Sequence, residues 1–467
     1  MQRYLLTRSA TRFGRLACGA LLTIGIADCS KDTLLAVKTP DQITPAAVAS
    51  AAGAQAQRVA GIGLFTRFFA ADAGGGGVSI NVTTAILGDE AFTARSGTEN
   101  LDSRAQDPNS FPANAPWAPY GNAYNGIVRA IRAVNAFPPT VAATKATQIG
   151  QLYLLDGYIF TLMAEAYCNG IPVSNVTDDA PATTTFLTVD LYNKALVLFD
   201  SALNTLSTSV GDQVFRNAAR VGKARVNVDL GNYATAATLL GVGGDGAGSV
   251  AVPTAYAYNV ELSTSTALSV NAAYDWMLAT KNFGASDKEG TNGLDYVSSK
   301  DPRITVDGTK VGPGQDGTPT PLFNQFPAVN SPVTLASGIE ARMIEAENFL
   351  SAGDLPNFLA SLNTARATKA GLAPLADPGT ANGRVDMLFR ERAFWMYFTS
   401  HRLGDMRRLI RQYARPTESV FPTGPYLHGG VYGTEVTLVP QQTELNNPLW
   451  GGPGSTNPKA VCKDMNP

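Results

Sequence analysis

The chain has 467 residues, of which 45% are hydrophobic and 16% are charged, and its formal net charge is −2. That length and apolar content are enough for a large core and, on length alone, for two or three domains. With no basic excess, the composition argues against a nucleic-acid-binding protein. The 45 glycines and 28 prolines predict long irregular loops between ordered elements.

The first 28 residues have the pattern of a signal peptide. Arginines at positions 3, 8, 12 and 15 precede an apolar run at 16–27, which is too short to span a bilayer. Cys29 follows, as in the cleavage site of bacterial lipoproteins, where this cysteine carries the lipid. Asp28 is unusual immediately before such a cysteine, so ordinary secretory cleavage nearby is the alternative. We expect lipid attachment at Cys29.

Apolar residues recur at helical spacing in several stretches of the chain. This periodicity predicts helices over residues 45–69, 120–137, 147–168, 189–206, 217–230, 234–240 and 337–351. Residues 249–335 lack sustained helical periodicity and alternate short β-like runs, such as 250–252 and 256–262, with turns. Long loops of this kind on a rigid scaffold are where binding sites usually lie.

The glycine-rich segment 241–248 could be mistaken for a phosphate-binding loop. It follows a helix rather than a strand, and no Gly-Lys-Ser/Thr is present. We therefore interpret it as a flexible insert.

Residues 384–413 predict two helices separated by a short break at Thr399 and Ser400, whose hydroxyls can cap free backbone N–H groups. In the second helix, Leu403, Met406 and Ile410 form an apolar stripe. Arginines at 402, 407, 408 and 411 lie largely off that stripe, which predicts a solvated basic face.

This stretch resembles the C-terminal helical hairpin of SusD/RagB-like outer-membrane lipoproteins. The matching residues are Glu391, Arg392, Phe398, Arg402, Asp405 and Arg408. Trp395, Thr399 and Ser400 stand where that family usually has Glu, Glu and Gly. The start of the predicted mature chain at Cys29 and the segments 164–174, 301–303, 339–372 and 438–448 also resemble the family.

The resemblance implies a mainly α fold, with tetratricopeptide-like helix pairs forming a scaffold, long loop-rich segments and minor β structure. It implies one SusD-like unit over residues 29–467, with a helical-repeat and loop-rich part at 29–335 and a SusD/RagB-type part at 336–467. Similar proteins are not enzymes. They are lipid-anchored at the bacterial outer membrane, bind glycans or other oligomeric nutrients, and pass them to a SusC-like TonB-dependent transporter.

Two alternatives to this nutrient-binding function remain open. One is a purely structural scaffold that binds a partner at the outer membrane, and the other is a secreted glycan-degrading enzyme. The chain has two histidines: His401, which we interpret as structural, and His428, which has no evident partner. No HExxH, GxSxG or zinc-ligand spacing occurs, so we predict no catalytic residue, metal ligand or cofactor. A carboxylate pair assembled by the fold and Ca²⁺ in an Asp/Asn-rich loop stay open.

Sugar binding needs exposed aromatic platforms beside hydrogen-bonding side chains. The loop candidates are Trp117, Tyr296, Tyr426 and Trp450, with Trp276 a weaker one. Packing in the core is the commoner role for such residues. Of the four cysteines, Cys18 lies in the signal peptide, while Cys168 and Cys462 either pair as a disulfide or remain separate thiols.

Overall fold

The computed structural model describes residues 48–72, 78–112, 114–173, 185–265 and 269–446. All of these residues except Val48 belong to one compact unit of the chain, Ala49–Pro467. This unit includes residues of the predicted helical-repeat part (29–335) and of the predicted SusD/RagB-type part (336–467). Cys29, Trp450 and Cys462 lie outside the described residues. In the described ranges, no helix combines the length and apolar character needed to cross a membrane.

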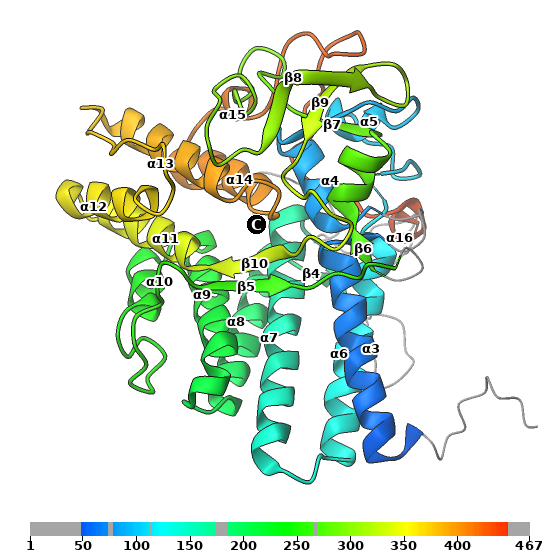
Figure 1. The fold of residues 1–467 in the computed structure, drawn as a ribbon, viewed down its shortest axis with the longest axis vertical. Helices are drawn as coiled ribbons and strands as arrows, with labels where there is room; N and C mark the ends of the chain where they lie inside the picture. Colours follow the sequence, from blue (N-terminus) through cyan, green and yellow to red (C-terminus); the bar gives the residue numbers. More distant parts are fainter. Residues whose placement is uncertain (1–47, 73–77, 113, 174–184, 266–268, 447–467) are drawn as a thin grey trace, which may run out of the picture. The chain divides into compact units, whose positions relative to one another are not determined.

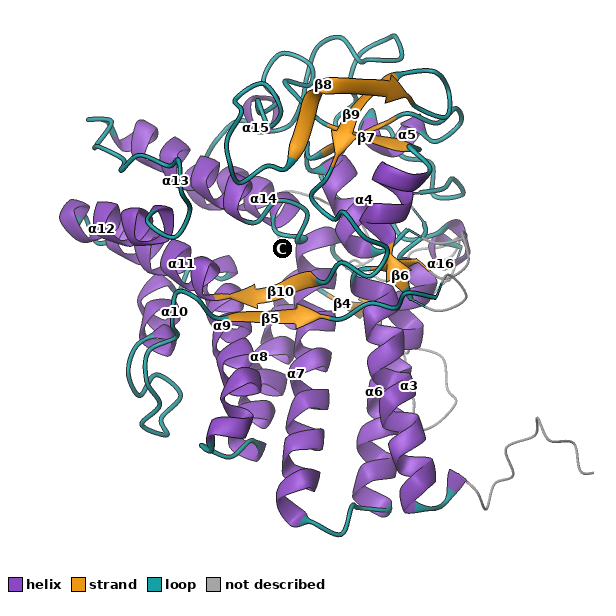
Figure 2. Cartoon of the chain, in the orientation of Figure 1, coloured by secondary structure: helices purple, strands orange, loops and turns teal. Residues whose placement is uncertain are grey.

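Helices dominate this unit, and its strands are short (Figures 1 and 2). The helices before residue 250 are α3 (Ala51–Phe69), α4 (Ile80–Leu87), α5 (Glu99–Asp102), α6 (Trp117–Ala136), α7 (Ala142–Ala166), α8 (Thr188–Thr205), α9 (Gln213–Asp229) and α10 (Tyr233–Leu240), with a 3₁₀ turn at Val210–Asp212. A π-helical turn at Tyr274–Ala279 follows. The later helices are α11 (Gly338–Ser351), α12 (Leu355–Arg366), α13 (Ala381–Trp395), α14 (Arg402–Tyr413), α15 (Thr417–Val420) and α16 (Gln442–Leu445). The predicted helices are confirmed, with ends that lie within about six residues of the predicted ones, and the mainly α fold class is confirmed.

The helices pack as successive pairs. Helix α3 packs on α6, α7 on α8, α9 on α10 and α11 on α12, and each pair contacts the next one. Figure 1 shows α3, α6, α7, α8 and α9 running side by side. This is the repeat arrangement that the sequence predicts, because no single pair can bury its apolar face alone.

Local signals place several helix ends. The side chains of Ser50, Ser337, Asp354 and Thr380 each accept a hydrogen bond from the backbone N–H three residues later, at the first turns of α3, α11, α12 and α13.

Helix α7 is buried along half of its length: every residue from Leu154 to Ala166 is buried. A helix covered on all sides is the centre of a core, and α7 is the helix around which the others pack.

Strands in the described residues form five two-stranded antiparallel sheets. The pairs are β1 (Ala71–Asp72) with β6 (Val270–Asn271), β2 (Ala91–Thr93) with β7 (Phe283–Ala285), β3 (Ile171–Pro172) with β4 (Thr185–Phe186), β5 (Ala257–Val260) with β10 (Val333–Ser337), and β8 (Val306–Pro313) with β9 (Pro319–Phe323). Three of the sheets join segments more than 70 residues apart, so they tie the loop-rich region to the helical scaffold.

Helix α14 corrects one expectation, because its predicted solvated basic face is buried. Arg402, Arg407 and Arg408 are each less than 7% exposed. Helix α14 packs against α4 and α7. There Arg407 donates to the backbone oxygens of Ala164, Glu165 and Tyr167, and Arg408 binds Glu347. Helical spacing could not reveal these partners, since they come from distant segments.

The glycine-rich segment is anchored by two buried arginines, so the expectation of a loose insert is wrong. Arg216 donates to Asp245 from Nε at 3.0 Å. Arg220 donates to the backbone oxygens of Leu239 and Val250, each at 2.7 Å, and so holds both ends of the segment. Burial alone would raise the pKa of Asp245, but hydrogen bonds from the segment and from Arg216 outweigh it and lower that pKa to about 2.

Candidate functional site

A cavity of about 410 Å³ lies between the β5–β10 sheet, the start of α11 and the turn that joins α13 to α14. We call it the Trp395 pocket. Its lining is Thr254, Ala255, Tyr256, Ala257, Gln325, Phe326, Thr334, Leu335, Ala336, Ser337, Ile339, Glu340, Thr368, Trp395, Met396, Tyr397, Thr399 and His401. The volume is in the range of small-ligand sites.

A tight turn at the end of β10 brings Glu340 to this pocket. Ser337 ends the strand, and its side chain accepts a hydrogen bond from the backbone N–H of Glu340 at 3.0 Å. Gly338 follows, and its N–H donates to the carbonyl of Tyr256 at 2.8 Å. A Cβ at position 338 would lie 1.9 Å from the carbonyl oxygen of Pro253, so the close approach requires glycine.

Aromatic side chains form one wall of the pocket. Trp395, the last residue of α13, is partly exposed, and Phe326 is nearly buried. The guanidinium of Arg303 lies 5.1 Å from the centre of the Trp395 ring. Arg303 is itself held by Asp301 and Glu391, so a fixed cation supports this ring. The indole N–H of Trp395 has no hydrogen-bond acceptor among the described residues.

Polar groups form the opposite end. Nδ1 of His401 lies 2.8 Å from the hydroxyl and 3.0 Å from the carbonyl of Thr399. Since that hydroxyl donates to the Met396 carbonyl, Nδ1 is the ring nitrogen placed to carry the proton. Nε2 lies 2.8 Å from Arg225 and 3.1 Å from Oε1 of Glu340. Burial and the charge of Arg225 lower the pKa of His401, and Glu340 partly offsets this effect.

Glu340 supplies an unfilled hydrogen-bond acceptor. Its side chain is 1% exposed, and apart from the His401 contact Oε1 has no donor among the described residues. Burial alone would raise the pKa of Glu340, but the charge of His401 and a hydrogen bond from it, followed by the charges of Arg225 and Arg392, outweigh burial and hold that pKa below its ordinary value. The pocket therefore contains a buried carboxylate whose charged form is favoured and whose Oε1 contacts only His401 among the described residues.

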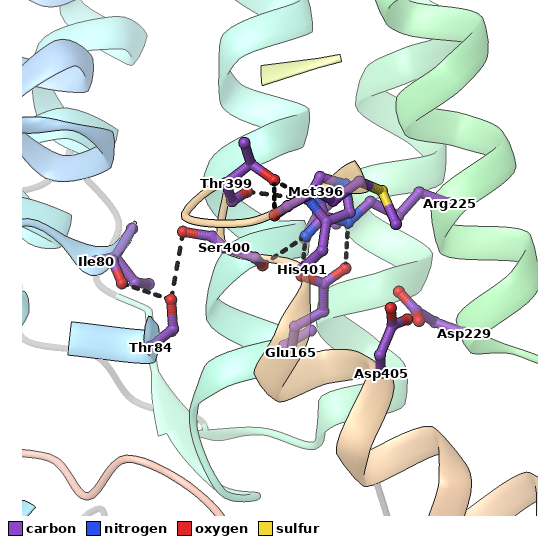
Figure 3. A network of polar contacts seen from close by, with 12 residues as sticks. Ile80, Thr84, Glu165, Arg225, Asp229, Met396, Thr399, Ser400, His401 and Asp405 are labelled. Atoms are coloured by element: carbon purple, nitrogen blue, oxygen red, sulfur yellow. Dashed lines mark hydrogen bonds and ion pairs between the residues drawn. The ribbon is translucent and has the colours of Figure 1, made fainter. Parts of the chain in front are cut away.

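A buried ionic network holds this polar end in place (Figure 3). Arg225 of α9 binds both carboxylate oxygens of Glu165 and donates to the carbonyl of Ser400 at 2.8 Å. Glu165 outweighs the effect of burial on Arg225 and raises the pKa of the guanidinium. Ser400 has a φ of 62°, in the left-handed region, and Phe398 has a φ of 58°. The turn that presents His401 is thus strained and kept in place by the network around it.

A second cavity, of about 690 Å³, lies in the loop-rich region, between residues of the segment 287–309 and Asn324. It is lined by Asp287, Val297, Ser298, Lys300, Asp301, Pro302, Ile304, Thr305, Val306, Asp307, Gly308, Thr309 and Asn324, with no aromatic side chain. A hydrogen bond of 2.9 Å from the Thr305 N–H to Oε1 of Gln325 links its wall to that of the Trp395 pocket. Without an aromatic platform it is the weaker candidate for sugar binding.

The aromatic residues singled out from sequence lie elsewhere. Trp117 packs against Tyr120 and Tyr167, and Tyr296 is fully buried between Phe394 and Tyr397. Tyr426 donates to Asp102 at 3.0 Å, and Trp276 donates to Asp72 at 3.0 Å. All four are less than 8% exposed, so none is an exposed platform. Their large apolar area is buried in the core instead, and Trp450 lies outside the described residues.

The remaining predicted sites are only partly described. Cys168 is buried and disulfide-bonded, while Cys462 and the lipid-attachment candidate Cys29 lie outside the described residues. The pairing of Cys168 with Cys462 stays a prediction. His428 does have a partner, contrary to expectation: Nε2 lies 2.7 Å from the carbonyl of Thr93. Within the described ranges, no group of three or more His, Cys, Asp or Glu residues is arranged to hold a metal ion.

Sequence reasoning missed Glu340 and Trp395. Trp395 did carry a signal, because it stands where the resembled hairpin usually has Glu. Glu340 carried none, because its role depends on the turn at Ser337 and Gly338 and on the approach of His401.

Comparisons with solved structures find the same fold at low sequence identity. A SusD superfamily protein from Parabacteroides distasonis aligns with a TM-score of 0.63 and 13% identity, over 85% of this chain and 97% of that one. A SusD superfamily protein from Bacteroides fragilis gives 0.60 and 13%, over 84% and 96%. A SusD-like carbohydrate binding protein from Bacteroides vulgatus gives 0.55 and 13%, over 76% and 83%. No family model matches the sequence, and no curated protein matches it. The chain has a SusD-like fold.

Proposed function

We propose that the protein binds a saccharide in the Trp395 pocket. The observation that carries the proposal is the buried carboxylate of Glu340, which lines the same cavity as the Trp395 ring and whose Oε1 contacts only His401 among the described residues. Sugars present hydroxyl donors around an apolar C–H face, so a carboxylate acceptor beside an aromatic ring satisfies both parts.

The fold supports this assignment. A protein with the same fold, from Bacteroides vulgatus, is described as a SusD-like carbohydrate binding protein. The likeness to it reaches only 13% identity, so the residues that bind sugar here are argued from this chain's own pocket.

We also propose that the bound saccharide is delivered to a TonB-dependent transporter at the outer membrane. This rests on the lipoprotein-like pattern at Cys29 and on the SusD-like resemblance of the sequence. In the Trp395 pocket, the lowered pKa of Glu340 keeps that group deprotonated, so it is unsuited to act as the general acid of a glycosidase. Binding without cleavage is the function that we propose for this pocket.

Binding is tested by calorimetric titration of the full mature chain with a panel of neutral oligosaccharides, alongside Trp395→Ala and Glu340→Gln. We expect at least one saccharide to bind the wild type and to bind either variant at least about tenfold more weakly, the loss of one strong hydrogen bond or stacking contact. Glu345→Gln is the matched control, because Glu345 lies on the same helix, pairs with Arg342 and does not line the pocket. Unchanged binding by both variants would move the site elsewhere, and release of new reducing ends would favour the enzyme alternative.

Partnership is tested separately by purifying the tagged full-length protein from mildly solubilised outer membranes and identifying what accompanies it. We expect a TonB-dependent barrel in roughly equal amount. Recovery only from the soluble fraction, with no barrel attached, would contradict both the lipid anchor and the transporter role.

A further inference from the structure

Arg402, the first residue of α14, is a buried cation that forms no hydrogen bond or ion pair through its guanidinium with any described residue. Its side chain is 6% exposed. The structure shows no hydrogen bond and no ion pair for its guanidinium among the described residues, and its Nε is fully covered. Other buried arginines of this hairpin do have anionic partners, as Arg392 has with Asp405 and Arg408 with Glu347. A buried charge left without compensation is costly, so the position of Arg402 calls for an explanation.

The side chain lines a cavity of about 370 Å³. We call it the Arg402 pocket, and its lining is Asn292, Leu294, Asp386, Phe389, Arg390, Arg402, Leu409, Arg415, Ser419 and Val420. It shares no lining residue with the Trp395 pocket. Its volume suits a small organic ligand rather than a bare ion alone, and four of its side chains are apolar.

The other charges of the Arg402 pocket are already paired. Arg390 binds Asp295 and Arg415 binds Asp386, each at 2.7 Å. Both carboxylates are partly exposed, at 32% and 66%. The positive and negative charges of each pair cancel, so the net charge of the pocket is the positive charge of Arg402.

Two acidic residues face Arg402 from the segment after α4, but neither forms an ion pair with it in the described structure. Burial raises the pKa of Asp89 to about 7 and that of Glu90 well above its ordinary value, and in both cases the charge of Arg402 only partly offsets the effect. Burial thus disfavours the charged form of both carboxylates. Neither group supplies a full counter-charge.

We propose that the Arg402 pocket binds an oxyanion, namely the carboxylate, sulfate or phosphate group of a small organic ligand. A guanidinium presents paired N–H donors that match two oxygens of such a group. The ligand's anionic group would supply the charge that Arg402 lacks, and the apolar lining of Leu294, Phe389, Leu409 and Val420 would contact its carbon skeleton. This site is separate from the proposed saccharide site and does not depend on it.

The test uses the full mature chain at constant ionic strength and pH 7, with four probes: inorganic sulfate, inorganic phosphate, D-glucuronate and the uncharged D-glucose. Binding is measured by calorimetry and by the rise of Tm with probe concentration. We expect glucuronate to bind and raise Tm while glucose does neither. Tighter binding of inorganic sulfate or phosphate would also support the oxyanion site and would identify the free ion as its source. Failure of all three anions would overturn the proposal.

Arg402→Met removes the charge and keeps most of the volume. We expect anion affinity to fall at least about tenfold, and the Tm without anion to stay level or rise, because an uncompensated charge is removed. Arg402→Lys, which keeps the charge but not the paired donors, should bind the anion more weakly than the wild type. Arg384→Met is the control, since Arg384 pairs with Asp377 away from this pocket. Equal anion binding by wild type and Arg402→Lys, together with undiminished binding by Arg402→Met, would overturn the proposal even if one variant folds poorly.

Discussion

Breaking the buried pair of Glu165 and Arg225 should destabilise the whole scaffold. Both side chains are 4% exposed, and the guanidinium binds both carboxylate oxygens. Glu165→Gln keeps the shape of the side chain but removes its charge, leaving Arg225 without its main counter-charge. Removing one member of a buried ion pair typically costs about 3–5 kcal/mol.

This cost converts to a shift in Tm. Unfolding entropy is about 2.1 cal/mol/K per residue, or about 0.8 kcal/mol/K over roughly 400 residues. The expected fall in Tm for Glu165→Gln is therefore about 4–6 °C, measured by differential scanning calorimetry. Asp200→Asn is the control, because Asp200 is 49% exposed and its partner Lys223 is 21% exposed, so this pair should be worth less than about 1 kcal/mol.

The double variant Glu165→Gln/Arg225→Met separates a charge effect from a packing effect. With both charges gone, no uncompensated charge remains, so we expect most of the lost stability to return. Two results would refute this reasoning: a Tm for Glu165→Gln no lower than that of Asp200→Asn, or a double variant no more stable than Glu165→Gln alone.

Three further predictions concern single positions. Ser400→Gly should be neutral or stabilising by up to about 1 kcal/mol in chemical denaturation, because Ser400 has a φ of 62° that glycine adopts without strain; a clear loss would show that its side chain matters more than its backbone. Asp89→Asn should leave Tm nearly unchanged at pH 4 and raise it by a few degrees at pH 8. The reason is that burial raises the pKa of Asp89 to about 7, so the folded state loses stability as pH rises from about 4 through 7 and this carboxyl ionises; equal Tm differences at both pH values would contradict it. Gly338→Ala should cost about 1–3 kcal/mol or more of stability and weaken saccharide binding, because the new Cβ would lie 1.9 Å from the carbonyl oxygen of Pro253 at the pocket wall. Unaltered Tm and saccharide affinity would show that the backbone of this wall shifts at little cost.

The helices could be predicted because their signals are local. Apolar spacing and end residues lie within each segment, so α6 to α11 appear in the sequence at nearly their observed bounds. Helix α4 could not be found this way. Its sequence, Ile80–Leu87, is rich in β-branched residues that favour strands, and it is a helix whose eight residues are all buried by the surrounding core.

The Trp395 pocket lay beyond sequence reasoning for a related reason. Its walls come from three segments, 254–257, 325–340 and 395–401, together with Thr368, and the meeting of the first two depends on the register of β5 against β10. Large aromatics such as Trp117 and Tyr296 looked equally suited to a sugar site, and only their burial separates them from Trp395.

The position of α14 has a consequence for the order of folding. Arg407 donates to three backbone oxygens at the end of α7, and α14 also packs on α4. Until residue 413 has been synthesised, those oxygens and the apolar surface of α7 lack their partners. Contacts over some 240 residues of sequence slow folding and leave apolar surface exposed meanwhile. The nascent chain therefore has to remain open, and protected from aggregation, until this late helix closes its core.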